Sequence, residues 1–252
     1  MLDRRIGAQL YTVRDLCQTY DDMDKCFEKI SAIGYKTVQV SGVGPLKGRE
    51  VKELCDKHGL EPIVTHRGIG EYFNNIDELI TYHKELGCKI CGLGWIPTEY
   101  RKTPEDLKAF ISAMNKVVEK LNENGLEFAY HNHSFEFMKL GGKYIMDMLL
   151  EETNFDFIVD VYWVAYSGID PARFIAKLGK RAKLLHFKDL AIREEKTCMC
   201  EVMEGNLDFD SIIAASDEAG SMAAFVEQDT CDKDPIESLA ISYRNLKTKG
   251  FN

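Results

Sequence analysis

The chain has 252 residues, of which 45% are hydrophobic and 29% are charged, as expected for a globular protein with a large core. Its formal net charge of −9 argues against binding to nucleic acid or to an anionic membrane surface. No uncharged apolar run approaches the roughly 18 residues needed to span a bilayer, and the N-terminal MLDRRIGAQLYTVRD lacks the apolar segment of a signal peptide. We therefore expect a cytoplasmic protein whose eight cysteines are free thiols.

Short apolar or β-branched runs alternate with amphipathic segments along the whole chain. The predicted strands cover residues 6–11, 37–40, 61–66, 89–94, 126–133, 155–161, 182–189 and 222–229. The predicted helices cover residues 23–34, 49–59, 76–87, 104–125, 143–152, 171–179, 207–220 and 235–250. A longer loop, which includes Cys198 and Cys200, is expected between the seventh strand and the following helix.

The strict alternation of strands and helices indicates a parallel sheet that is buried on both faces. Eight such units in 252 residues predict an α/β fold, a closed (β/α)8 TIM barrel that forms a single domain over residues 1–252. A doubly wound open sheet is the alternative, but no G-x-G-x-x-G motif follows the first strand.

Polar side chains gather where the predicted strands end, which is where (β/α)8 barrels carry their chemistry. His131 and His133 lie two residues apart on one strand, so their side chains project to the same side. Each polar residue alone could be a hydrogen-bonded core group. A divalent metal ion, however, would account together for the four strand ends that carry His131, Asp160, His186 and Glu227.

The ligand set of this predicted metal site combines nitrogen and oxygen without thiolate, which suits Mn²⁺, Zn²⁺, Co²⁺ or Fe²⁺. Cys88 and Cys91 have the C-x-x-C spacing, but they lie along a predicted strand and no second C-x-x-C pair completes a zinc site. We expect these two thiols to be buried and structural.

Six segments, IGAQLYTVRD, GYKTVQVSG, AYHNHSFEF, DVYWVAYSG, LLHFKD and EGNLDF, follow one another over nearly the whole chain. Together they resemble the xylose isomerase-like TIM-barrel family, which comprises sugar phosphate isomerases and epimerases. The resemblance implies one divalent metal ion, held by His131, Asp160, His186 and Glu227. Epimerases of the family usually carry glutamate at the position of His131. The chain is in this respect similar to a His-x-His branch that includes inosose dehydratase-like and keto-glycoside-processing members.

We therefore predict a metal-dependent sugar isomerase or epimerase that acts on a sugar or keto-sugar. The metal would chelate a ketone and a neighbouring hydroxyl while Glu227 removes the adjacent C–H proton, which produces an enediolate. Lys188 or His66 would supply or orient a proton, although Lys188 could instead form an ion pair with Asp189 at the rim.

Four further residues are predicted to contact the substrate: His133, Trp95, Trp163 and Tyr11. His133 could instead be a second metal ligand on its strand. Both tryptophans follow strands and could stack on a sugar ring, with core packing as the alternative. Glu136, three residues beyond His133, is expected to lie behind the site.

Other functions stay open at this stage. The missing glutamate makes a metal-dependent lyase or dehydratase, acting on a keto-sugar or keto-glycoside by β-elimination, the main alternative. An endonuclease IV-like DNA repair enzyme is disfavoured by the net charge of −9 and by the few histidines at the strand ends. A non-catalytic sugar-binding barrel is the third reading. The expected partner is a small sugar, unphosphorylated because no phosphate-binding loop occurs, and the sequence is compatible with a homo-oligomer.

Overall fold

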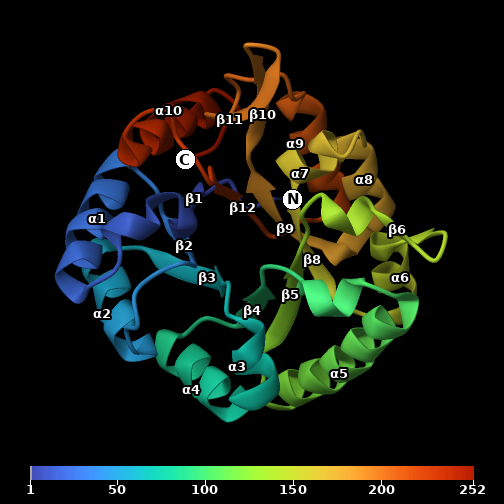
Figure 1. The fold of residues 1–252 in the computed structure, drawn as a ribbon. Helices are drawn as coiled ribbons and strands as arrows, with labels where there is room; N and C mark the ends of the chain where they lie inside the picture. The colour runs from blue at the N-terminus through green and yellow to red at the C-terminus, as the bar shows by residue number, and fades with distance from the viewer. Residues whose placement is uncertain (1) are drawn as a thin grey trace.

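Eight parallel strands close into a barrel in the computed structural model, which describes residues 2–252 (Figure 1). Around the ring, β1 pairs with β2 on one side and with β12 on the other. The barrel strands are β1 Gly7–Gln9, β2 Thr37–Val40, β3 Glu61–Thr65, β4 Ile90–Leu93, β5 Glu127–His131, β8 Asp156–Asp160, β9 Ala182–Phe187 and β12 Ala223–Val226. This architecture confirms the predicted (β/α)8 fold.

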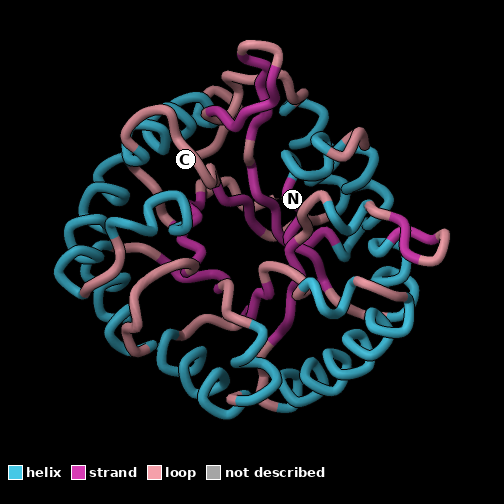
Figure 2. The backbone as a smooth tube through the Cα atoms, in the orientation of Figure 1, coloured by secondary structure: helices cyan, strands magenta, loops and turns pink. Residues whose placement is uncertain are grey.

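Helices surround the barrel and cover the outer face of its strands (Figures 1 and 2). The helices that correspond to the predicted ones are α1 Tyr20–Ile33, α2 Gly48–His58, α4 Ile76–Leu86, α5 Pro104–Glu123, α6 Ile145–Glu152, α8 Pro171–Leu178, α9 Phe209–Ala219 and α10 Pro235–Lys247. Local sequence fixes several of their ends. The Thr103 hydroxyl accepts the Asp106 backbone N–H at 3.1 Å and so caps α5. No helix within residues 2–252 combines the length and the apolar character needed to cross a membrane.

Short elements that the sequence did not predict follow several strands: η1 Leu10–Leu16, α3 Ile69–Asn74, η2 Thr98–Arg101, η3 Phe135–Phe137 and α7 Val161–Tyr166. Another, η4 Gly179–Arg181, follows α8. The prediction of a strand over 6–11 was therefore too long. The Gln9 side chain accepts the Tyr11 backbone N–H at 3.2 Å, which turns the chain into η1 directly after β1. Tyr11 consequently lies at the barrel mouth and not on a strand.

The predicted loop between β9 and α9 was also wrong, because much of it is a projecting hairpin of β10 Asp189–Arg193 and β11 Lys196–Cys200 (Figure 2). Its turn consists of Glu194 and Glu195, with φ angles of 49° and 62°. Hairpin turns with positive φ normally use Gly, Asn or Asp, so the sequence carried no turn signal here. A smaller hairpin joins β6 Lys139–Leu140 to β7 Lys143–Tyr144.

The barrel interior has an apolar layer formed by Ile63, Val64, Ile90, Ala129, Ile158, Leu184, Ala223 and Phe225. Side chains two residues apart on a strand share a face. Two positions further along β5, β8, β9 and β12, the same face therefore presents the polar residues His131, Asp160, His186 and Glu227. We call these two groups the apolar layer and the polar layer. All eight cysteines are free thiols, and Cys88 and Cys91 are buried as predicted.

Candidate metal centre

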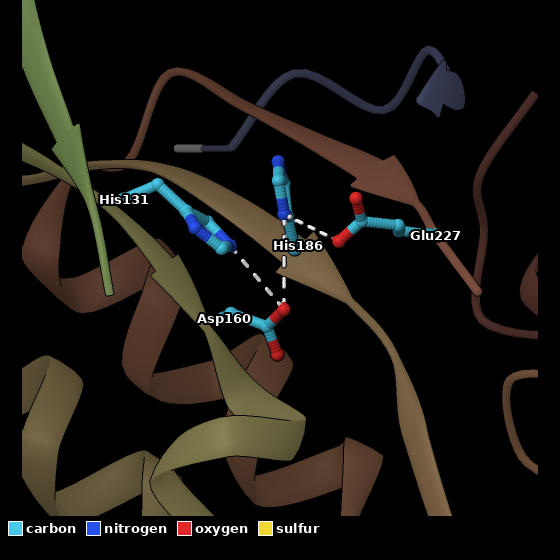
Figure 3. Close-up of side chains that lie close together, drawn as sticks. All are labelled: His131, Asp160, His186 and Glu227. Atoms are coloured by element: carbon cyan, nitrogen blue, oxygen red, sulfur yellow. Dashed lines mark hydrogen bonds and ion pairs between the residues drawn. The ribbon is translucent and has the colours of Figure 1, made fainter. Parts of the chain in front are cut away.

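The polar layer brings four potential metal ligands together at the carboxyl ends of the strands (Figure 3). One ligand atom from each of the four residues lies within 4.8 Å of those of the others, and all four residues are buried. Strand pairing contributes directly, because Asp160 on β8 is in register with His186 on β9. The side chains that the sequence predicted to converge do converge.

Hydrogen bonds behind the two histidines select the ring nitrogen that faces the cluster. Nδ1 of His131 lies 3.1 Å from the Gly94 carbonyl oxygen, and Nε2 of His186 lies 2.7 Å from the Gln39 side-chain oxygen. Because both acceptors take a ring N–H, the neutral form of each ring would have its lone pair on the nitrogen that faces the cluster, His131 Nε2 or His186 Nδ1. The Gln39 contact therefore explains a polar residue in the middle of an apolar strand.

The contact between His186 and Glu227 resembles that between two ligands of the same metal ion. His186 Nδ1 lies 2.8 Å from Glu227 Oε2, yet this buried nitrogen has no hydrogen bond within residues 2–252. The two atoms are close, but they are not aligned as donor and acceptor. Such an arrangement suits a cation between them better than a direct hydrogen bond.

Among the described residues, Lys188 is the only one whose ammonium group contacts this cluster. Its side chain is 1% exposed, and Nζ lies 2.8 Å from Asp229 Oδ1, 3.3 Å from Glu227 Oε2 and 3.4 Å from Asp160 Oδ2. Three carboxylates and one ammonium leave two negative charges when the imidazoles are neutral. A divalent cation would offset this buried charge, so the residues present fit one metal ion.

The same negative field shifts the pKa values of the cluster. Burial by itself would lower the pKa of His186, but the Glu227 and Asp160 carboxylates outweigh it and raise this pKa to about 9. Burial would raise the pKa of Glu227, but His186 and Lys188 hold it below its ordinary value. Glu227 is therefore an ionised carboxylate at neutral pH. The pKa of Lys188 is raised, since Asp160 and Glu227 outweigh the effect of burial, and its amine stays charged.

Asp189 is not the partner of Lys188, contrary to the rim ion pair considered from the sequence. Its carboxylate accepts the backbone N–H groups of Met203 at 2.9 Å, Gly205 at 3.0 Å and Leu207 at 3.2 Å. These bonds hold the segment that leads from the β10–β11 hairpin to α9. Asp189 thus organises the backbone, and Asp229 takes the place that was expected for it.

A cavity of about 350 Å³ opens above the polar layer. Six of the predicted site residues line it: Tyr11, His66, Trp95, His131, His133 and Glu227. Burial holds the pKa of His66 well below its ordinary value and lowers that of His133 to about 3, so both rings are neutral. Trp95 lines the cavity and is 58% exposed, so its indole is accessible to a ligand.

Sequence reasoning gave no role to several other residues that line the cavity, among them Ser41, Gly42, Arg67 and Asp229. Ser41, Gly42 and Arg67 lie one or two positions beyond the predicted strands 37–40 and 61–66, whereas Asp229 is the last residue of the predicted strand 222–229. Arg67 directly follows His66, for example, and Asp229 follows Glu227 after one residue. Extending the search by two residues past each predicted strand would have included Ser41, Gly42 and Arg67.

Trp163, in contrast, is not among the residues that line the cavity. Its ring packs 5.6 Å from the ring of His133 and 5.3 Å from Lys188 Nζ. Its backbone N–H donates to Asp160 Oδ1 at 3.1 Å, so this ligand also caps α7. The other carboxylate oxygen of Asp160 is thereby oriented toward the cluster.

Glu136 lies behind the site, as the sequence predicted, and does not join the four-residue cluster. It is fully buried, and its carboxylate accepts the His133 backbone N–H at 2.8 Å and the Tyr130 hydroxyl. The Tyr130 oxygen in turn accepts the Ile96 backbone N–H at 3.1 Å. Burial raises the pKa of Glu136 to about 7. This chain of hydrogen bonds connects the two loops that carry Trp95 and His133.

A closed parallel barrel with buried ionisable residues at the carboxyl ends of its strands has the organisation of a (β/α)8-barrel enzyme. The chain belongs to the xylose isomerase-like TIM barrel family, whose sequence profile matches residues 27–240. This confirms the family to which the sequence motifs pointed.

Individual relatives are distant but extend over most of the chain. The rhizopine catabolism protein MocC of Rhizobium meliloti is 23% identical over 89% of this chain and 80% of its own length. An inosose dehydratase of Clostridium perfringens is 20% identical over 94% of this chain and 96% of its own length. A sugar phosphate isomerase/epimerase from Parabacteroides distasonis has a similar structure, with a TM-score of 0.82 and 23% identity over 98% of this chain and 94% of that one. These proteins thus include a dehydratase that is similar in sequence and an isomerase/epimerase that is similar in structure.

Proposed function

We propose that the protein is a divalent-metal-dependent enzyme that isomerises or epimerises a sugar or keto-sugar by removing the proton next to a carbonyl group. One observation carries this proposal. Glu227 belongs to the cluster of four potential metal ligands and also lines the cavity above it. A single ionised carboxylate therefore reaches both the candidate metal position and the space for a substrate.

In this proposal His131, Asp160, His186 and Glu227 hold the metal ion. When bound, such an ion supplies a Lewis acid that polarises a substrate carbonyl. Gly94 and Gln39 fix the two histidine rings. The carboxylates of Asp160 and Glu227 are already ionised, whereas His186, with a pKa of about 9, would release a proton when the metal ion binds.

Glu227 is the proposed base. His186 and Lys188 both contact its Oε2, whereas Oε1 has no partner within residues 2–252. Oε1 would accept the proton of the C–H bond, whose electron pair then forms a carbon–carbon double bond while the carbonyl oxygen takes the negative charge. An isomerisation is completed when the hydroxyl on the deprotonated carbon gives its proton to that oxygen and becomes the new carbonyl, while the abstracted proton returns to the former carbonyl carbon.

His66 and His133 are proposed to bind the substrate as neutral imidazoles. The Nε2 atom of His66 and the Nδ1 atom of His133 are buried and have no hydrogen-bond partner within residues 2–252. Each could bond a substrate hydroxyl without a charged partner. Lys188 is assigned a different role from that of a proton donor. Its raised pKa and its three carboxylate contacts fit a group that offsets charge and holds Glu227 and Asp229 in place.

Elimination is a second candidate function. The carboxylates of the cavity favour it, because they follow a single strand. Glu227 and Asp229 are the carboxylates that line the cavity among the described residues, and both follow the same strand, β12. Epimerisation needs a group on the opposite face of the substrate to return the proton, and β5 offers His131 there in place of a carboxylate. After proton removal, the electron pair of the broken C–H bond could instead form a double bond to the β-carbon. The substituent on the β-carbon would then take up a proton and leave. An inosose dehydratase among the relatives is consistent with this outcome.

Proton exchange with deuterated water tests the proposal on the Glu227→Gln variant. Glutamine keeps the shape and one ligand oxygen but removes the basicity, so we expect folded protein whose turnover falls by about 10²–10⁴-fold. Exchange of the proton next to the carbonyl, followed by NMR on a panel of ketoses and inososes, should also stop. Asp229→Asn is the matched control, since it changes a neighbouring carboxylate on the same strand and should preserve exchange.

Two results would decide against these assignments. Normal exchange by Glu227→Gln in excess metal would make Glu227 a ligand only, whereas loss of exchange in Asp229→Asn alone would move the base to Asp229. Products formed with and without a leaving group on the β-carbon separate the two candidate functions, because elimination requires that group and isomerisation does not.

A further inference from the structure

A second hollow, of about 390 Å³, adjoins the cavity above the metal cluster. The two share the lining residues Ser41, Gly42, His66 and Arg67, so they lie on either side of the same residues. The remaining wall of the second hollow comes from Gln18, Glu71 and the segment 40–46, and none of the four candidate metal ligands lines it. We call it the distal compartment. The first cavity alone already has the volume of a site for a small ligand, so the distal compartment is additional room.

The wall of the distal compartment is held firmly in place. The Gly44 backbone N–H donates to the Cys17 carbonyl at 2.9 Å, and the Gln18 side-chain amide donates to the Gly42 carbonyl at 2.9 Å. A Cβ atom on Gly44 would lie 1.9 Å from the Gln18 carbonyl oxygen, so the two segments touch closely and only glycine fits. A wall that is ordered before a ligand arrives lowers the entropic cost of binding.

The charges of the distal compartment cancel. Arg67 stands where the two hollows meet, and its Nε and Nη2 atoms donate to Glu71 Oε2 at 2.9 and 2.6 Å. Its guanidinium also lies 4.2 Å from the centre of the Tyr82 ring. Nη1 has no acceptor within residues 2–252 and can bond a ligand oxygen. A phosphate or carboxylate would meet a guanidinium that is already paired, whereas a hydroxyl or ether oxygen needs only this one donor.

We propose that the substrate has two units: one sugar or polyol ring that reaches the metal cluster, and a second, uncharged sugar ring that occupies the distal compartment. The proposal rests on the proposed function for the first ring. It adds that Arg67 contacts the substrate at the junction between the two rings. The polar backbone of residues 41–46 and the Arg67–Glu71 pair form a surface for hydroxyl groups, with no unpaired charge among the residues that line it.

Calorimetric titration of the metal-loaded protein tests this proposal with stable sugars as probes. Cellobiose, maltose and lactose are compared with glucose and galactose. At least one disaccharide should bind at least about tenfold more tightly than its component monosaccharides, an effect that corresponds to about 1.4 kcal/mol. In Val43→Trp this preference should disappear, because Val43 lines the distal compartment alone and an indole would fill it, while monosaccharide binding should stay unchanged.

Met222→Trp is the control, because it places the same bulk on an exposed residue just before β12, at the opposite end of the barrel. If Val43→Trp does not fold, Pro45→Trp fills the compartment from an exposed position of the same segment. The proposal is overturned if no disaccharide binds more tightly than its monosaccharides, or if the tryptophan weakens both kinds of sugar equally. Either result leaves proton exchange on a one-ring keto-sugar intact, so failure of the second ring is read separately from failure of the proposed function.

Discussion

The apolar and polar layers of the barrel interior lie on the same faces of the same strands. Ala129, Ile158, Leu184 and Phe225 are each followed, two residues later, by His131, Asp160, His186 and Glu227. That spacing is roughly 6.6 Å along a strand. Both layers are buried to the same extent, but burial stabilises the first and costs free energy in the second unless the charges have partners. Burial alone therefore does not distinguish the hydrophobic core from the candidate site. The two differ because the buried charges of the site need partners of opposite charge.

The largest expected effect comes from removing the ammonium group of Lys188, which contacts the polar layer. In metal-free protein, Lys188→Met should lower the free energy of unfolding by about 3–5 kcal/mol, because it leaves the buried carboxylates of Asp160 and Glu227 and the partly buried one of Asp229 without their ammonium. Urea denaturation measures this change. Added divalent metal should restore part of the loss.

Lys52→Met is the matched control, since Lys52 forms an exposed ion pair with Asp56 on α2. Such pairs contribute about 0.3–0.5 kcal/mol. Equal losses in the two lysine variants would mean that the polar layer is not held together by charge.

Leu184→Ala probes the apolar layer two residues before His186. We expect a loss of about 2–5 kcal/mol in the free energy of unfolding, from the lost burial and the cavity left behind. The metal affinity of the folded protein should not change. A clear loss of metal affinity would show that the two layers are coupled and that their comparison as separate regions is wrong.

Glu136 sharpens the comparison because it is buried and ionisable but lies outside both layers. Its pKa in the folded protein is about 7, above the ordinary 4.5, so the folded state binds more protons than the unfolded state between these values. Its contribution to stability is thus present at low pH and is lost as the pH rises through about 7. The difference in unfolding free energy between wild type and Glu136→Gln should fall by up to about 3 kcal/mol from pH 4 to pH 8. A difference that is independent of pH would contradict the raised pKa.

Substitutions of His131 and His133, the two histidines at the end of β5 and just beyond it, give the smallest effect in free energy. His131→Ala should weaken metal binding by at least about 10–100-fold, since a direct ligand matters no less than the groups that orient it. His133→Ala should mainly reduce turnover, because His133 lines the cavity but is not part of the cluster. Equal loss of metal by the two variants would make both residues ligands.

The two-residue repeat of side chains along a strand explains why so much of this site could be predicted from the sequence. Carboxylates and imidazoles that interrupt apolar runs stand out, and parallel strands must bring their carboxyl ends to one rim. His131, Asp160, His186 and Glu227 met both conditions, and the structure brings them together.

The residues that escaped prediction lie in loops, where no period applies. Arg67 lines both hollows although nothing in the local sequence marks it, because its position depends on the ion pair with Glu71 one helical turn later. Trp163 was predicted at the substrate but packs behind the cavity, because Asp160 caps the unpredicted helix α7 and directs this ring toward His133. Side-chain contacts of this kind become visible only when the chain is folded.

The central claim is that the polar layer is a site for one divalent metal ion. The most direct test is the metal content of purified protein by elemental analysis, with Asp160→Asn beside the wild type. Asparagine keeps the oxygen that caps α7 at Trp163 but removes a charged ligand. We predict one divalent ion per wild-type chain and its loss from the folded Asp160→Asn variant. Wild-type protein that takes up no divalent ion, or an Asp160→Asn variant that retains the same ion with the same affinity, would contradict the account.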